Sequence, residues 1–226
     1  RPLAKLYPLL GIEREFSIGV SAHLRYAESI SRPTIWEVLG STGIPNSGLS
    51  PEEVREAEAG LDVNKGHISA TITGYLRRTE GMILSRMVNN NTEEEFINAG
   101  NADQNGVEWI VTGTHDLPGK HRIEISLEGA WQHHLLHLPD AGPVDVPGVP
   151  RWTGGIRARL VTRWATALEA GYLANSSIAA SSNTDDRIAG HGVMQARIEQ
   201  PLRWKGMEVR AFVLVENLLD AHYTDF

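Results

Sequence analysis

The sequence lacks cysteine, and it also lacks an apolar run as long as a membrane-spanning helix. Without cysteine the chain can form neither a disulfide framework nor a metal site with thiolate ligands. A spanning helix takes about 18 or more consecutive apolar residues, so a helical membrane protein is excluded. A membrane β-barrel is not excluded, because its strands are apolar on one face only.

Enzyme motifs and an excess of positive charge are also missing. There is no Gly-x-Ser-x-Gly elbow, no phosphate-binding glycine loop and no His-Glu-x-x-His. Glu56 and Glu58 share one face of a strand, which a polar wall also requires, so they do not indicate an acid–base pair. The net charge of −7 argues against a nucleic-acid partner. We expect no enzyme activity, no catalytic residue, no cofactor and no metal site.

What the sequence has is a one-for-one alternation of apolar and polar residues, the period of a β-strand. The clearest segment is 122–132, whose apolar face comprises Ile123, Ile125, Leu127, Gly129 and Trp131. Its other face comprises Glu124, Ser126, Glu128, Ala130 and Gln132. The same alternation places Phe16, Ile18, Val20, Ala22, Leu24 and Tyr26 on an apolar face, and likewise Ile68 to Leu76, Ile156 to Leu160 and Met207 to Val215.

The alternating segments predict an all-β, antiparallel up-and-down sheet of about ten strands. We expect strands at 3–12, 16–30, 53–63, 67–84, 105–115, 121–136, 152–162, 166–177, 192–200 and 206–218. A single β-unit commonly reaches roughly 200–250 residues, so residues 1–226 can form one unit.

The connections between these strands alternate between short and long. Tight turns are expected at 13–15, 64–66, 116–120, 163–165 and 201–206. Long connections, rich in Asn, Gly, Pro, Ser and Asp, are expected at 31–52, 85–104, 137–151 and 178–191. This asymmetry is typical of bacterial outer-membrane barrels, in which the long loops are extracellular.

A soluble β-sandwich or soluble barrel would show the same alternation, and both interpretations remain open on these patterns. The apolar faces hold many small residues, around which lipid tails can fill without leaving a void. These are Ala22, Ala57, Ala59, Ala70, Gly74, Gly113, Gly129, Ala158, Ala170, Ala174, Ala196 and Ala211.

Several segments resemble, in the family's order, the C-terminal half of the barrel of TonB-dependent outer-membrane receptors. The first is Tyr26-Ala-Glu-Ser-Ile-Ser-Arg-Pro-Thr34, similar to a strand that ends in an Arg-Pro-Thr corner. The others are Leu49-Ser-Pro-Glu52 with Glu58-Ala-Gly-Leu61, Asn98-Ala-Gly-Asn-Ala102 with Gly106-Val-Glu108, Val149-Pro150, and Val215-Glu-Asn-Leu-Leu-Asp220 with Tyr223. The resemblance covers nearly the whole chain and implies an outer-membrane-type β-barrel.

The chain also departs from that family's pattern. Nothing in it resembles the N-terminal TonB box, the plug domain or the early strands of the barrel. It begins Arg1-Pro2-Leu3 without an initiator Met or a signal segment. It stops at Phe226, one strand short of the family's closing strand, so we do not interpret Phe226 as the family's terminal aromatic residue. We therefore expect residues 1–226 to be a fragment, the C-terminal portion of an incomplete barrel.

Three groups of side chains are candidates for a site. His133, His134 and His137 suggest a metal, but adjacent residues of a strand point to opposite faces, so we expect histidines at the barrel rim. Arginines on the polar face are expected to pair with acids of a plug or of neighbouring strands, with anion capture as an alternative. The arginines are Arg25, Arg77, Arg157, Arg159, Arg163, Arg197 and Arg210, and the acids include Glu56, Glu58, Asp62, Glu124, Glu128, Glu169 and Glu208.

Tryptophans and one acidic run complete the candidates. Trp109, Trp131, Trp152, Trp164 and Trp204 are expected in interfacial girdles, with Trp164 and Trp204 at the short-turn rim, and core packing is the alternative. The run 89–95 is expected to be a solvated loop.

The resemblance implies a receptor in the outer membrane of a Gram-negative bacterium that imports a scarce nutrient. Its partners would be outer-membrane lipid, TonB through an N-terminal region absent from this chain, and a small-molecule ligand such as an iron-siderophore complex, haem or cobalamin. The ligand and its contact residues are unknown from sequence. A passive channel or porin and a soluble β-rich binding module are the alternatives.

Overall fold

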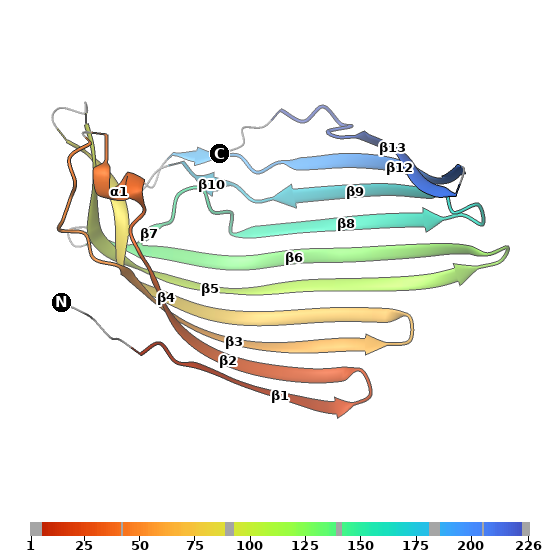
Figure 1. Cartoon of the computed structure of the whole chain (residues 1–226), viewed down its shortest axis with the longest axis horizontal. Helices are drawn as coiled ribbons and strands as arrows, with labels where there is room; N and C mark the ends of the chain where they lie inside the picture. The colour runs from red at the N-terminus through yellow and green to blue at the C-terminus, as the bar shows by residue number, and fades with distance from the viewer. Residues whose placement is uncertain are drawn as a thin grey trace.

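The computed structural model describes residues 6–41, 43–88, 93–138, 142–180, 186–204 and 206–222. Ten long strands form one antiparallel sheet in which every strand pairs with the next long strand along the chain (Figure 1). These strands are β1 (Leu9–Ser17), β2 (Val20–Ser31), β3 (Glu52–Lys65), β4 (Ile68–Val88), β5 (Glu93–Leu117), β6 (His121–His137), β8 (Trp152–Val161), β9 (Ala167–Asn175), β12 (Gly192–Trp204) and β13 (Met207–Val215).

Short elements lie in the long connections. Helix α1 (Ile35–Leu39) follows β2, strand β7 (Val144–Asp145) pairs with β6, and β10 (Ile178–Ala179) pairs with β11 (Arg187–Ile188). Figure 1 shows α1, β7 and β10 at one end of the sheet and the short turns at the other. The predicted all-β, up-and-down architecture with a short-turn rim and a long-connection rim is confirmed.

The strand register gathers the apolar residues on one face. One continuous row runs from Val20 through Val63, Ala70, Val111, Leu127 and Ile156 to Tyr172. Ile125 and Leu127 are 44% and 46% exposed, so no second sheet covers them among the described residues. The sheet therefore has no conventional core, and its buried apolar residues are few: Ile83, Ala102, Leu136, Ala167 and Ala179 within the described parts.

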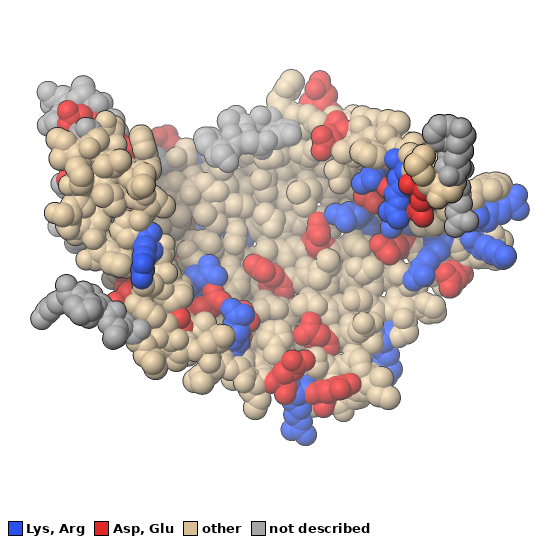
Figure 2. Space-filling model, viewed as in Figure 1, with Lys and Arg blue, Asp and Glu red and all other residues tan. Residues whose placement is uncertain are grey.

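The opposite face carries the predicted polar residues. Glu124 lies opposite Arg159, and Ser126 lies opposite Arg157. Figure 2 shows this face hollowed, with acidic and basic side chains spread over it. Within the described residues β1 and β13 each pair on one side only, so the curved sheet is open.

The apolar face forms a band of limited height. On β4 it runs from Ile68 to Leu76, and the next outward position is Arg78, which lies opposite Arg55 and Asp103. Nine residues match the ~9–11 residues with which a tilted strand crosses a bilayer. The band therefore has the height of a hydrocarbon core and ends at a charged row on the long-connection side.

The first predicted turn is wrong. Glu13, Arg14 and Glu15 lie inside β1, and the chain reverses at Ile18 and Gly19. Gly19 has φ +78°, and a Cβ atom there would collide with the carbonyl oxygen of Asn64. The turn therefore needs glycine, whereas the charged triplet fits a strand because Glu13 and Glu15 face the polar side.

The predicted long connection at 85–104 is also wrong, because β4 extends to Val88 and β5 begins at Glu93. A β-bulge at Gly81 (φ +67°) shifts the register between Glu80 and Met82 and interrupts the sequence alternation. Above the apolar band both faces of the hairpin can be polar, so its Asn-rich sequence is compatible with strand pairing. The last turn is shorter than predicted, because β12 continues to Trp204.

No helix in the described part of the chain is long and apolar enough to span a membrane.

Candidate functional site

Two regions of the molecule carry polar groups in organised arrangements: the hollow face and the long-connection rim. On the hollow face, Glu56 of β3 binds two arginines from the strands on either side. Its carboxylate lies 3.5 Å from Arg25 of β2 and also contacts Arg77 of β4. Arg25 reaches Glu58 as well, at 3.3 Å. The predicted pairing across strands is present here.

A second charged cluster lies on β8, β9 and β12. Glu169 is 3.7 Å from Arg157 and 4.0 Å from Arg159, while Arg197 pairs with Glu199 at 2.6 Å. The guanidinium of Arg197 also lies 4.7 Å from the ring centroid of Phe212. Four arginine side chains in these two clusters are at least 40% exposed: Arg25, Arg157, Arg159 and Arg197. Each of their ion pairs therefore adds little stability, and each arginine keeps N–H donors for another partner.

Other predicted polar residues also find partners. Asp62 accepts a hydrogen bond from Thr71 at 2.8 Å and lies 3.3 Å from His23, and Arg210 lies 3.7 Å from Glu208. Arg163 does not lie on the hollow face as predicted. It occupies the turn between β8 and β9, where its guanidinium stacks 4.3 Å from the ring of Trp164.

The tryptophans lie toward both ends of the apolar band. Trp131 and Trp152 are direct partners at the long-connection side and are about half exposed, whereas Trp164 lies in a short turn as predicted. Trp109 lies one row further into the band. The side chain of Trp204 lies outside the described residues.

The three histidines do not converge. His133 lies opposite Asn105 on the outer face, and His134 lies opposite Gln104 on the hollow face. His137 lies 3.0 Å from Asp103. No group of three His, Cys, Asp or Glu residues that could hold a metal occurs in the parts of the chain that the structure describes.

The connection between β2 and β3 is folded against the tall β4–β5 hairpin. Thr34 caps the N-terminus of helix α1. Its hydroxyl accepts from the Glu37 N–H while the Glu37 carboxylate accepts from the Thr34 N–H. Farther along, the Asn46 amide donates to the Phe96 carbonyl at 2.8 Å. Asn98 accepts from the Ser50 N–H at 2.8 Å and donates to the Ser50 carbonyl at 2.9 Å. A long connection is thereby fixed to β5 by the Asn98 side chain and the Phe96 carbonyl.

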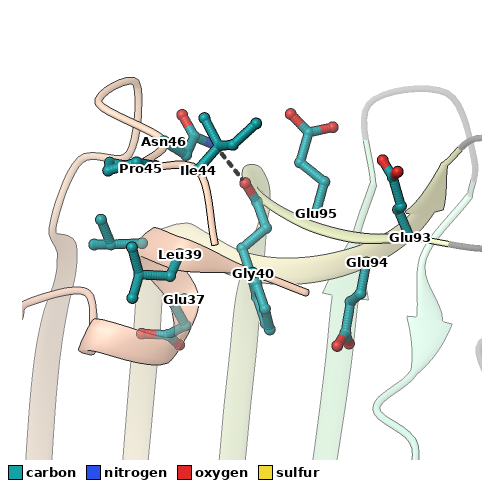
Figure 3. A pocket seen from close by; sticks show the side chains of 11 residues that line it. Glu37, Leu39, Gly40, Ile44, Pro45, Asn46, Glu93, Glu94 and Glu95 are labelled. Carbon is teal, nitrogen blue, oxygen red and sulfur yellow. Dashed lines mark hydrogen bonds between the residues drawn. The ribbon is translucent and has the colours of Figure 1, made fainter. Parts of the chain in front are cut away.

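A cleft of about 490 Å³ lies between this connection and β5 (Figure 3). Its lining is mixed, with apolar residues such as Ile44 and Pro45 on one side and Glu93, Glu94 and Glu95 on the other. These glutamates belong to β5, so the prediction of a solvated loop at 89–95 is wrong for residues 93–95. Residues 89–92 lie outside the described residues. Gly40, with φ +55°, allows close approach to the Glu94 carbonyl.

The other two long connections are joined by one carboxylate. Asp145 of β7 accepts two hydrogen bonds from Arg151, both at 3.1 Å, and one from Arg187 of β11 at 3.3 Å. Partial burial would by itself raise the pKa of Asp145. The two arginines outweigh that effect and hold the pKa below its ordinary value of 3.8.

This rim was only partly foreseeable. The composition of the connections predicted them, but α1, β7 and the β10–β11 pair were missed because each is five residues or fewer. The capping box Thr34-Ile-Trp-Glu37 is the signal that could have revealed α1. Chemically, the rim offers hydrogen-bonding and apolar surface on a rigid scaffold, an arrangement suited to binding.

Comparisons with known proteins agree with this architecture. A family model described as TonB dependent receptor-like, beta-barrel, matches residues 15–218. No curated protein matches the chain significantly. Among solved structures, the chain is similar to BauA, the ferric preacinetobactin receptor from Acinetobacter baumannii, with 15% identity and a TM-score of 0.71 over 96% of this chain and 32% of that one.

Two further structures have the same fold. The ferric citrate transporter FecA in its unliganded form is 17% identical, with a TM-score of 0.75 over 96% of this chain and 34% of its own. The copper transporter OprC is 18% identical, with a TM-score of 0.75 and the same coverage. The chain thus spans about a third of the length of these structures. Because the family model covers most of its residues, the chain belongs to the TonB-dependent receptor β-barrel family.

Proposed function

We propose that residues 1–226 form one unit of an outer-membrane receptor wall, the C-terminal portion of its β-barrel, in a Gram-negative bacterium. The observation that carries this proposal is the nine-residue apolar band on the outer face, matched by a polar hollow face and covering the height of a bilayer core. Family membership over residues 15–218 supports the same role.

The receptor would import a scarce nutrient by TonB-dependent transport, with TonB bound through an N-terminal region outside this chain. We propose an iron-siderophore complex as the first nutrient class to test, because similar structures include a ferric preacinetobactin receptor and a ferric citrate transporter. The similarity to a copper transporter makes copper a necessary comparison. A soluble module would leave the apolar band in water without a partner.

The ligand would contact the long-connection rim. The segment 40–50 is the strongest candidate, because Asn46 and Ser50 are held by β5 and the cleft lies beside them. A ligand-binding loop that is already fixed loses less conformational entropy when it binds. The joined connections around Asp145 would form a second part of the same rim.

The exposed arginines of the hollow face would bind the plug of the complete receptor. Arg25 and Arg77 are each more than two-fifths exposed although they pair with acids, so their remaining donors face the lumen. Substituting Arg25 with Gln in the full-length receptor should loosen the plug, detected as faster hydrogen exchange of plug amides. Unchanged exchange would count against plug binding by this arginine.

The function is tested by expressing the full-length receptor in cells that lack their own receptors. Uptake of labelled ferric siderophore, haem, cobalamin and copper is measured with and without a protonophore. Energy-dependent uptake of one ligand supports the proposal, and energy-independent uptake identifies a passive channel. Replacing 40–50 by Gly and Ser should lower ligand affinity by about tenfold or more while folding is retained. The turn predicted at 64–66 lies at Gly66 and His67, because β3 continues to Lys65, and replacing these two residues at the opposite rim is the matched control.

A further inference from the structure

The outer face of β8, β9 and β12 carries a shallow apolar groove of about 410 Å³. Its floor is a row of three alanines that lie directly opposite one another: Ala158, Ala170 and Ala196. Larger side chains form its walls, namely Ile123, Leu160, Leu168, Ile198, Val213 and Val215. The other lining residues, Arg159, Glu169 and Arg197, alternate with these and direct their charged side chains to the hollow face. Every side chain that points into the groove is therefore apolar, so the groove can hold a hydrocarbon chain but offers nothing to a polar ligand.

The short-turn rim next to this groove is basic. Among the described side chains, segments 116–122, 161–166 and 201–208 carry Lys120, Arg122 and Arg163 against Asp116 and Glu208, in a chain whose net charge is −7. Figure 2 shows Lys and Arg gathered at this end of the molecule. Arg163 stacks on the exposed Trp164, an arrangement that holds its positive charge at the edge of the apolar band.

The spacing between groove and rim suits one lipid leaflet. Strand β8 ends at Val161, three residues beyond Ala158 and roughly 10 Å along the strand at ~3.3 Å per residue, and Arg163 follows in the turn. With a strand tilt of about 40°, the strand end lies about 8 Å nearer the membrane surface than the alanines. One leaflet of a ~30 Å hydrocarbon core is about 15 Å thick, so a chain lying over the alanines has its headgroup near Arg163.

We propose that this groove binds one acyl chain of an anionic phospholipid, with the lipid phosphate against Arg163. The proposal rests on the proposed function, because it requires the outer face to lie in a membrane. Charge complementarity selects the lipid, since a basic residue at the membrane surface attracts anionic headgroups. The three alanines determine where the acyl chain lies, because their small side chains leave a groove that the larger neighbouring side chains enclose.

The test uses the full-length receptor purified in detergent and mixed with equal amounts of phosphatidylglycerol and phosphatidylcholine of identical chains. Native mass spectrometry counts the lipids retained. The wild type should retain phosphatidylglycerol about fivefold better, the effect of one basic residue at the surface. Arg163→Gln should remove this preference, and Ala170→Leu, which fills the floor, should lower retention of both lipids about tenfold.

Matched controls lie on the same face and at the same rim. Ala70→Leu places an equal side chain on β4, outside the groove, and Lys65→Gln removes one basic charge at a distant short turn. Both should retain lipid like the wild type. Equal retention of the two lipids by the wild type, or equal losses in the controls and the groove variants, would overturn the proposal.

The two proposals fail differently. A receptor that folds in membranes and imports its ligand, yet shows no preferred lipid, would refute only the groove. A full-length protein that is soluble without detergent would refute the membrane receptor itself.

Discussion

The indole ring of Trp109 on β5 lies over Gly129, the residue directly opposite it on β6. A Cβ atom at residue 129 would lie 2.8 Å from Trp109 Cε2 and 3.0 Å from the Thr153 carbonyl oxygen. The glycine therefore provides the space in which a tryptophan can lie flat on the outer face. Such a contact joins β5, β6 and β8 without forming a core.

Substituting Gly129 with Ala should destabilise the folded receptor by about 1–3 kcal/mol, because a rigid ring and a backbone carbonyl would have to move. Urea unfolding of the full-length protein in detergent micelles measures the change. Gly113→Ala is the control, since nothing lies within 4 Å of its Cβ position, and it should change stability by less than about 0.5 kcal/mol. The cost at residue 129 should fall in a Trp109→Leu background, and equal costs in both backgrounds would contradict the contact.

Charge should be tolerated unequally on the two faces. Leu127 lies on the outer face between Val111 and Ile156, so Leu127→Arg should destabilise the membrane-inserted barrel by ~2–4 kcal/mol. Ser126→Arg on the hollow face should cost no more than about 1 kcal/mol, the repulsion from Arg157 opposite it. Equilibrium folding into lipid vesicles compares the two, and equal losses would mean that the outer face is not in lipid.

Asn98 should control the order of the connection before β3. Its side chain bonds the Ser50 N–H and carbonyl and also donates to the Gly81 carbonyl at 2.6 Å. Asn98→Ala should release residues 43–50, giving faster hydrogen exchange and proteolysis there, at a local cost of about 1–3 kcal/mol. Asn64→Ala at the short-turn end of β3 should leave this segment unchanged. Unaltered protection in Asn98→Ala would show that these bonds do not order the connection.

Low pH should separate β7 from β11. The pKa of Asp145 is depressed below 3.8 in the folded state, so its ionised carboxylate stabilises the contact above pH 3.8 and loses this effect as the pH falls through the folded pKa. Hydrogen exchange of residues 144–151 and 186–188 should be slow at pH 6 and, after correction for intrinsic rates, faster below pH 3.8. Asp145→Asn should exchange quickly at both pH values. Protection that persists in Asp145→Asn would assign the contact to other groups.

Residues 1–226 expressed alone should neither insert efficiently nor transport. In the described part of the sheet, β1 and β13 each have one unpaired edge, and every unsatisfied backbone group in hydrocarbon costs several kcal/mol. The isolated chain should therefore aggregate, and uptake should require the full-length protein. Energy-dependent uptake by the isolated chain, measured in cells without the native receptor, would disprove this expectation.

The alternation in the sequence determined the sheet. In segments such as 122–132 the face of each side chain can be assigned without knowing which strands pair with the segment. Neighbouring residues of a strand point in opposite directions. The same reasoning separated His133 from His134 correctly. It also located most strands and the two rims, since most of the short turns contain glycine or proline and the long connections carry polar residues.

Tertiary structure decided the strand ends and turns in the parts of the chain where the alternation of apolar and polar residues does not predict them. Above the apolar band neither face has to be apolar throughout, so the extension of β4 and β5 to Val88 and Glu93 follows from backbone pairing and not from a pattern of side chains. The reversal at Gly19 instead of Glu13-Arg14-Glu15 depends on its close approach to Asn64, a residue 45 positions away. The sequence by itself thus determined which face each strand presents, because that is a local property of the backbone. Only the folded chain decided strand ends, loop anchors such as Asn98, and the groove over three alanines, because these depend on which distant residues lie opposite one another.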